Sequence, residues 1–260
     1  MKRLKDLIYK FLFNFKLYLF KDYIKSDIYF DNNDGYLLKF ASDKIKNDKE
    51  VVMQAVKQYG GALQYASDEL RNNKEVVLEA VCQNGFALKF SSDELKNNKG
   101  VVLEAVKQYG YALEFASKEL QNDKEVVMGA VRHNGLSLKY ASTELLSDKY
   151  VVLEAVKEDG NALKYASKEL KNDKEVVLEA VTKNGNALKF SSDELKNNKE
   201  IVLTALKQNE ESLIYASEEI RSKLNEKFPN NPEEGLRILI EMEALSQGKS
   251  LEKTKQGLKL

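Results

Sequence analysis

The sequence predicts an all-α fold, a right-handed-type α-solenoid of seven to eight 25-residue repeats with a capping helix at each end. Two observations predict it. A glycine recurs every 25 residues together with the residues around it, and the chain contains only 2 prolines. Proline breaks helices, whereas the abundant Lys and Glu favour them. The glycines with this spacing are Gly35, Gly60, Gly85, Gly110, Gly135, Gly160 and Gly185.

Each repeat begins with a predicted amphipathic helix. In the repeat Asp48–Asn72, the apolar residues Val51, Val52 and Val56 belong to an arc of roughly 200° at 100° per residue. So wide an arc predicts a helix that packs on two sides, against its own repeat and a neighbour. Asp or Asn is the expected N-cap in every repeat, and the periodic glycine is expected to end the helix as a left-handed cap. The glycine caps predicted are Gly60, Gly85, Gly110, Gly135, Gly160 and Gly185.

The second segment of the repeat allows two interpretations. A continuous helix after the glycine would place Glu69 on the apolar face, and an acid recurs at this position in the following six repeats. A helix that restarts at Ser67 would avoid this, because the hydroxyl would cap the new turn and the acid would lie at its positive end. The alternative is a straight helix with its glutamates exposed at the edge.

A recurring aromatic residue is the largest side chain of the repeat. It is interpreted as a ladder of rings through the core, with a base-stacking platform for single-stranded nucleic acid as the alternative. The residue before the ring varies between Lys, Gln, Glu and Ile, so no basic groove accompanies the rings. The rings are Phe40, Tyr65, Phe90, Phe115, Tyr140, Tyr165, Phe190 and Tyr215.

The block from Asn172 to Asn198, NDKEVVLEAVTKNGNALKFSSDELKNN, resembles the repeat of the DUF4116 family. The similarity extends from Gly35 to about Ile220. It implies an α-helical tandem repeat without assigned chemistry, seen in bacteria and protists, and it transfers no catalytic residue. The chain departs from the pattern at Gly100, Gly129, Tyr150 and Glu210.

The predicted organisation has three parts: a capping helix in residues 1–30, the array in residues 31–222, and a cap helix with a frayed tail in residues 223–260. Residues 2–24 have helical apolar spacing with basic and aromatic residues. This segment could cap the first repeat, lie on an anionic membrane or dock to a partner, or be a signal or membrane span. We expect it to be a cap. Expected contacts of the C-terminal cap are Leu236, Leu239, Ile240 and Leu245.

Composition and side-chain inventory predict a protein without catalytic chemistry. Lys and Arg number 41 and equal Asp and Glu, so no overall basic field favours a nucleic-acid partner. The single cysteine, Cys82, excludes an internal disulfide and suits the cytoplasm. It lies two repeats from His133, the single histidine, or roughly 20 Å at 8–10 Å per packed helix. That separation is too great for a nucleophile and its base. We therefore expect no cofactor, no metal and no enzymatic activity.

The positions beside each glycine vary most and are expected to line one ridge. They are interpreted either as surface drift or as a partner-binding face with aromatic and Arg anchors. We predict a non-enzymatic scaffold for protein–protein interaction. The alternatives are a peripheral membrane protein that uses residues 2–24 and a delivered bacterial effector of unknown activity. The candidate partner-binding residues are Tyr59, Phe86, Tyr109, Tyr111, Arg132 and His133.

Overall fold

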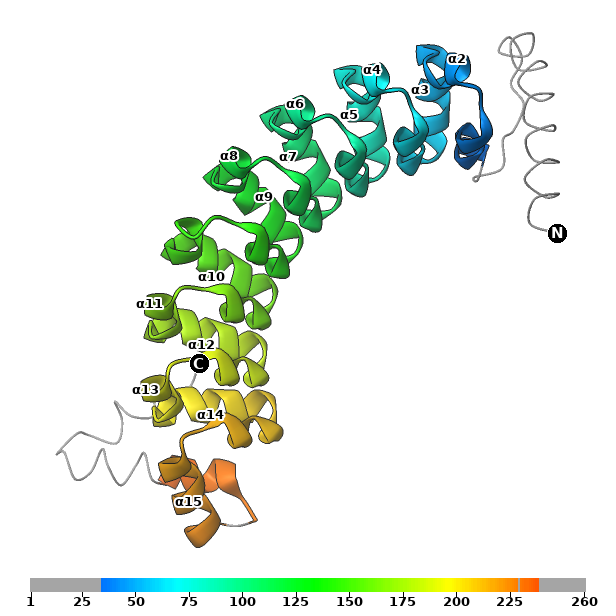
Figure 1. Ribbon diagram of the computed structural model, residues 1–260. Coiled ribbons are helices and arrows are strands. Elements are labelled where there is room, and N and C mark those ends of the chain that lie inside the picture. The colour runs from blue at the N-terminus through cyan, green and yellow to red at the C-terminus, as the bar shows by residue number, and fades with distance from the viewer. Residues whose placement is uncertain (1–33, 229, 239–260) are drawn as a thin grey trace. The chain divides into compact units, whose positions relative to one another are not determined.

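The computed structural model describes residues 34–228 and 230–238, and every regular element in those ranges is an α-helix or a 3₁₀-helix (Figure 1). The chain divides into two compact units, Met1–His133 and Asn134–Leu260. The predicted all-α repeat fold is thereby confirmed. The predicted N-terminal capping helix, residues 1–30, lies outside the described residues.

Three elements make up each repeat: a ten-residue α-helix, a six-residue 3₁₀-helix and a four-residue helical turn. Unit 1 contains η1 (Asp34–Phe40), α2 (Asp43–Lys46), α3 (Lys49–Gln58), η2 (Gly60–Tyr65), α4 (Asp68–Arg71), α5 (Lys74–Gln83), η3 (Gly85–Phe90), α6 (Asp93–Lys96), α7 (Lys99–Gln108), η4 (Gly110–Phe115), α8 (Lys118–Gln121) and α9 (Lys124–His133).

Unit 2 continues the same order, with a short 3₁₀-helix in place of its first helical turn. It contains η5 (Gly135–Tyr140), η6 (Leu145–Ser147), α10 (Lys149–Glu158), η7 (Gly160–Tyr165), α11 (Lys168–Lys171), α12 (Lys174–Lys183), η8 (Gly185–Phe190), α13 (Asp193–Lys196), α14 (Lys199–Gln208), η9 (Glu210–Tyr215) and α15 (Glu218–Lys227). Residues 232–238 are helical too, and Leu236 there is fully buried, as expected of the C-terminal cap. The other expected contacts of this cap lie outside the described residues.

The long helices form the centre of each unit. In unit 1, α3, α5, α7 and α9 pack side by side in chain order, and in unit 2 so do α10, α12 and α14 (Figure 1). In α5, Val76, Val77, Ala80 and Val81 are all fully buried. Burial of residues all around this arc confirms the prediction of a helix that packs on two sides.

The predicted N-caps of the long helices are confirmed. The Asp48 carboxylate accepts hydrogen bonds from the backbone N–H groups of Glu50 at 3.1 Å and Val51 at 3.3 Å. A cap of this kind satisfies amides that have no partner within the helix. The equivalent residues Asn73, Asn98, Asp123, Asp148, Asp173 and Asn198 accept in the same way.

The helical restart is confirmed as well, so the straight second helix is wrong. The Ser67 hydroxyl accepts a hydrogen bond from the backbone N–H of Leu70 at 3.3 Å and caps α4. The six residues before it form η2 rather than part of an α-helix. The same serine cap recurs at Ser92, Ser117, Ser142, Ser167, Ser192 and Ser217.

The recurring acid of the second segment has an inter-repeat partner. The Ser67 hydroxyl donates to the Asn47 side-chain oxygen, and Asn47 Nδ2 donates to Glu69 Oε2 at 3.2 Å. The asparagine of one repeat is therefore hydrogen-bonded to both the capping serine and the acid of the following repeat. The same Asn–Glu contact, 3.0–3.2 Å long, recurs at Asn72–Glu94, Asn97–Glu119, Asn172–Glu194 and Asn197–Glu219.

Ion pairs connect successive long helices at their N-terminal ends. Lys99 Nζ lies 2.7 Å from Asp123 Oδ2 and 2.8 Å from Glu125 Oε2. Burial alone would raise the pKa of Asp123, but the hydrogen bonds from Lys99 and from backbone N–H groups hold it below its ordinary value. Each exposed pair contributes little by itself. Equivalent pairs are Lys49–Glu75, Lys149–Asp173, Lys149–Glu175 and Lys174–Glu200.

The prediction that the periodic glycines are left-handed helix caps is wrong. Helix α3 ends at Gln58, Tyr59 follows in an extended conformation with φ −144° and ψ 98°, and Gly60 opens η2. Its φ is outside the left-handed region. The other glycines predicted as caps, Gly85, Gly110, Gly135, Gly160 and Gly185, also open 3₁₀-helices.

Close approach between repeats explains these glycines instead. A Cβ atom on Gly60 would lie 2.4 Å from the carbonyl oxygen of Ala80 in the next long helix. No side chain fits at that distance, so only glycine lets the 3₁₀-helix approach the following repeat so closely. Glu210 occupies this position in the last repeat, where the pattern ends, and it is exposed.

A buried hydroxyl in unit 2 provides a test of the packing. Ser137 is fully buried, its Oγ has no hydrogen-bond partner, and most repeats have alanine at this position. Because an unsatisfied buried hydroxyl is costly, Ser137→Ala should raise the free energy of unfolding by about 1 kcal/mol in urea titrations. Ser191 is a matched control, since its buried hydroxyl donates to the Leu188 carbonyl at 2.8 Å. Equal stabilisation by Ser191→Ala would contradict this explanation.

Candidate interaction surface

All six predicted partner-binding residues lie in unit 1. Tyr59 and Tyr109 follow the ends of α3 and α7. Phe86 and Tyr111 are the second residues of η3 and η4. These four side chains are half-buried, whereas Arg132 and His133, at the end of α9, are exposed.

Three of the six form one cluster of rings. Phe86 lies 6.2 Å from Tyr109 between ring centroids, and Tyr109 lies 5.7 Å from Tyr111. Phe86 also contacts Phe90 at 5.9 Å and Phe115 at 5.3 Å. All four contacts are edge-to-face, the arrangement that aromatic quadrupoles favour. We call these five residues the η3–η4 ring group.

A second cluster lies at the start of unit 1. Tyr36 contacts Phe40 at 6.2 Å and Tyr65 at 5.8 Å, again edge to face, and 39% of Tyr36 is exposed. Burial raises the pKa of Tyr65 above its ordinary value, and the neighbouring Tyr36 raises it further. We call Tyr36, Phe40 and Tyr65 the η1–η2 ring group. Sequence analysis placed Phe86, Tyr109 and Tyr111 on the candidate partner-binding ridge, but it assigned the recurring rings Phe40, Tyr65, Phe90 and Phe115 to the core.

The prediction of a ring ladder through the core is wrong in its location. Each of the eight recurring rings is half-buried, from Phe40 to Tyr215. The core is formed by the smaller residues, such as Leu63 and Leu88, which are fully buried. A half-buried ring suits a position that either Tyr or Phe occupies, because the tyrosine hydroxyl reaches water.

Lysine side chains lie over many of these rings. Lys89 Nζ is 5.4 Å from the Phe86 ring centroid and 5.8 Å from that of Phe115. Such cation–π contacts contribute about 0.5–1 kcal/mol at exposed sites. The signal for them in the sequence is a lysine directly before the ring. In unit 2 a lysine lies over the ring directly after it at Lys139–Tyr140, Lys164–Tyr165 and Lys189–Phe190, and Lys189 Nζ is also 5.9 Å from the Tyr215 ring centroid.

The remaining predicted residues have structural contacts within the chain. A Cβ atom on Gly61 would lie 2.5 Å from Tyr59 Cζ, so the Tyr59 ring fills the space beside that glycine. His133 Nδ1 accepts a hydrogen bond from the backbone N–H of Gly110 at 3.4 Å. The Gln83 side chain accepts from Gly60 N–H in the same way, at 2.8 Å.

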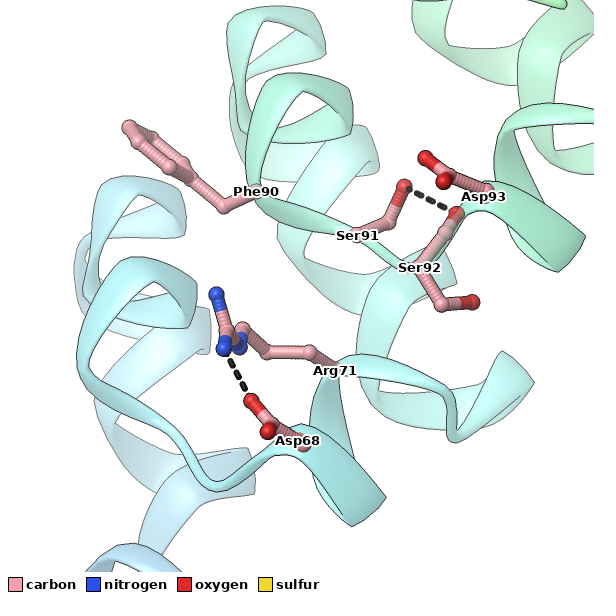
Figure 2. Close-up of a pocket in the computed structure, with 6 residues that line it drawn as sticks. All are labelled: Asp68, Arg71, Phe90, Ser91, Ser92 and Asp93. Atoms are coloured by element: carbon pink, nitrogen blue, oxygen red, sulfur yellow. Dashed lines mark hydrogen bonds and ion pairs between the residues drawn. The ribbon is translucent and has the colours of Figure 1, made fainter.

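A surface pocket of about 230 Å³ adjoins the η3–η4 ring group at Phe90 (Figure 2). Figure 2 shows Arg71 reaching into it from the end of α4, paired with Asp68. Arg71 Nε is buried without a hydrogen-bond partner. Asp93 also lines the pocket, so the lining contains two carboxylates and one guanidinium. Because negative charges outnumber the positive charge, this pocket does not favour the binding of an anion.

Two observations concern the reactivity of the thiol and the grouping of possible metal ligands among the described residues. Partial burial raises the pKa of the Cys82 thiol, and the carboxylates of Glu104 and Glu79 raise it further. A reactive cysteine requires the opposite shift. Within residues 34–228 and 230–238, no three His, Cys, Asp or Glu side chains gather in a way that could hold a metal ion.

Comparison with known proteins identifies the family. A model described as a domain of unknown function, DUF4116, matches residues 32–71, 48–96, 98–146, 148–196 and 173–221. The chain belongs to the DUF4116 family. Four of the five DUF4116 matches are 49 residues long, close to the length of two consecutive 25-residue repeats. No curated protein and no solved structure matches the chain. Among the described helices, none is long and apolar enough to cross a bilayer.

Proposed function

We propose that this DUF4116 protein is a non-enzymatic scaffold that binds another protein through the ring groups of unit 1. The observation that carries the proposal is the gathering of half-buried rings beside the periodic glycines. Phe86 of η3 and Tyr111 of η4 each meet Tyr109, which follows α7, edge to face. Aromatic residues in such positions dominate the free energy of binding in protein interfaces.

The two units differ at the positions that carry these rings. Where unit 1 has Phe86 and Tyr111 after its glycines, unit 2 has Asn161 and Asn186. The frame of the repeat is the same in both units, since the caps and the buried leucines recur. The rings are therefore not needed to build a repeat. This difference supports a role for them in binding, and it favours unit 1 over unit 2.

The double substitution Tyr109→Ala and Tyr111→Ala should abolish capture of a cellular partner by the immobilised full chain. Removal of both rings leaves Phe86 without Tyr109 and takes away the apolar contact area, while the buried leucines stay in place. Quantitative mass spectrometry of the captured proteins, compared with the unsubstituted chain, gives the result. The far-UV circular dichroism of the variant should be unchanged.

Tyr150→Ala provides the matched control. Tyr150 is 53% exposed, lies in unit 2 and belongs to neither ring group. Its substitution removes an exposed tyrosine and should leave the captured proteins unchanged. Unaltered capture by the Tyr109 and Tyr111 double variant, or an equal loss with Tyr150→Ala, would refute a partner site on the ring groups.

A further inference from the structure

Two lysines of unit 1 each lie over a pair of aromatic rings. Lys39 Nζ is 5.4 Å from the Tyr36 ring centroid and 5.6 Å from that of Phe40, and it donates to the Tyr36 hydroxyl at 3.1 Å. Lys89 lies over Phe86 and Phe115. Both lysines are exposed. Each ammonium group is thus placed on an apolar floor and remains accessible from solvent.

The repeat between these two sites lacks both of their features. Gln64 stands at the position of the lysine, and its amide donates to the Gly61 carbonyl at 2.9 Å. Gly61 stands at the position of the first ring. The lysine-and-ring sites at Lys39 and Lys89 therefore lie two repeats apart. At 8–10 Å per packed helix, that separation is roughly 16–20 Å.

We propose that the two lysine-and-ring sites bind an acidic, extended segment of the partner protein, an inference that rests on the proposed function. An extended chain advances about 3.3 Å per residue and its side chains alternate between two faces, so carboxylates six residues apart, about 20 Å, would lie on one face and reach both sites. Each carboxylate would pair with the ammonium of Lys39 or Lys89. Apolar side chains between them would cover the ring edges.

Carboxylates suit this surface better than nucleotides. A base would have to stack on a ring face. In the η3–η4 ring group, Lys89 already covers faces of Phe86 and Phe115, and these two rings meet at 90°. What remains accessible is ammonium groups and ring edges, and ring edges carry partial positive charge. Both attract carboxylate oxygens, while the planar stack needed for bases is blocked.

Fluorescence anisotropy with synthetic peptides and the full chain tests this inference. The probe is a fluorescein-labelled peptide of about twelve residues, with leucine and serine between two glutamates that are six residues apart, so that both lie on one face of the extended chain. It should bind at low salt. A peptide of the same composition with its glutamates adjacent, and one with lysines in their place, should each bind at least about tenfold more weakly, because neither offers a carboxylate to both sites.

The matching variants are Lys39→Gln with Lys89→Gln, which should weaken the first peptide about tenfold, and Lys164→Gln, which should not. Lys164 lies over the Tyr165 ring in unit 2, and it contacts no second ring among the described residues. Equal affinity for the two glutamate spacings would overturn the inference, as would an unaffected double variant. Tighter binding of a fluorescein-labelled oligothymidylate, lost in the same double variant, would overturn it in favour of nucleic acid.

The outcome is distinguishable from failure of the proposed function. Protein capture that depends on Tyr109 and Tyr111, without any discrimination between the peptides, would refute the acidic partner and leave a protein scaffold. If capture does not depend on Tyr109 and Tyr111 and the peptides are not discriminated, both the protein scaffold and its acidic partner segment are refuted. Because Lys39 and Lys89 are exposed, their substitution should leave the circular dichroism spectrum unchanged.

Discussion

Replacement of Gly160 by alanine is expected to lower the free energy of unfolding by about 3 kcal/mol. The new Cβ would lie 2.3 Å from the carbonyl oxygen of Ala180 and 3.1 Å from Asn184 Cβ. The first obstacle is backbone, so no side-chain rotation relieves it. Either η7 or α12 must move, and the fully buried Val176 and Val177 of α12 would move with it. Urea titration followed by far-UV circular dichroism would measure the loss.

Gly100 provides the control for this substitution. It lies in the first turn of α7, and a Cβ there would have Asn98 Oδ1 as its nearest neighbour, at 3.5 Å. Because alanine favours helices and nothing obstructs it, Gly100→Ala should stabilise the protein by up to about 1 kcal/mol. A similar loss of stability in both variants would contradict the assignment of close approach to the periodic glycine.

The elements that sequence analysis located correctly depend on local interactions. Asp48 caps α3 through amides two and three residues ahead, and Ser67 caps α4 through one three residues ahead. Such bonds join residues within one turn, so residue type and spacing are enough to predict them. The wide apolar arc of the long helix is likewise visible in a ten-residue window.

The interpretations that failed concern contacts between repeats. Gly60 approaches Ala80, and Asn47 pairs with Glu69, at separations of 20 and 22 residues. A glycine after a helix fits a left-handed cap equally well when only its own repeat is considered. In a periodic chain, every residue also recurs 25 positions later, so the pattern does not reveal which neighbour imposes it.

The candidate surface was predicted only in part for a related reason. Phe86, Tyr109 and Tyr111 stand out because they vary between repeats, and the structure places them together. Lys39 and Lys89 were obscured because the position before the ring was judged over all eight repeats at once. Grouping of alternate repeats would have separated these lysines from Gln64. Three of the DUF4116 matches, 48–96, 98–146 and 148–196, likewise start 50 residues apart.

Leu163→Ala is expected to lower the free energy of unfolding by about 3–4 kcal/mol. Leu163 belongs to η7 and is fully buried. Neighbouring elements on both sides in unit 2 enclose it, because η7 contacts η5, α10, α12 and η8. The substitution therefore leaves a cavity that no single element can close. Urea and thermal unfolding of the full chain would both register the loss.

Leu213 occupies the same position in the last repeat and isolates the contribution of the following neighbour. It is half-buried in η9, which contacts η8 and α14. With part of the leucine already in water, Leu213→Ala should cost about half as much as Leu163→Ala. In an array whose stability is a sum of repeat and nearest-neighbour contributions, the difference between the two variants measures one interface. Equal losses would show that each repeat is stabilised mainly by its own contacts, contrary to a core shared between neighbours.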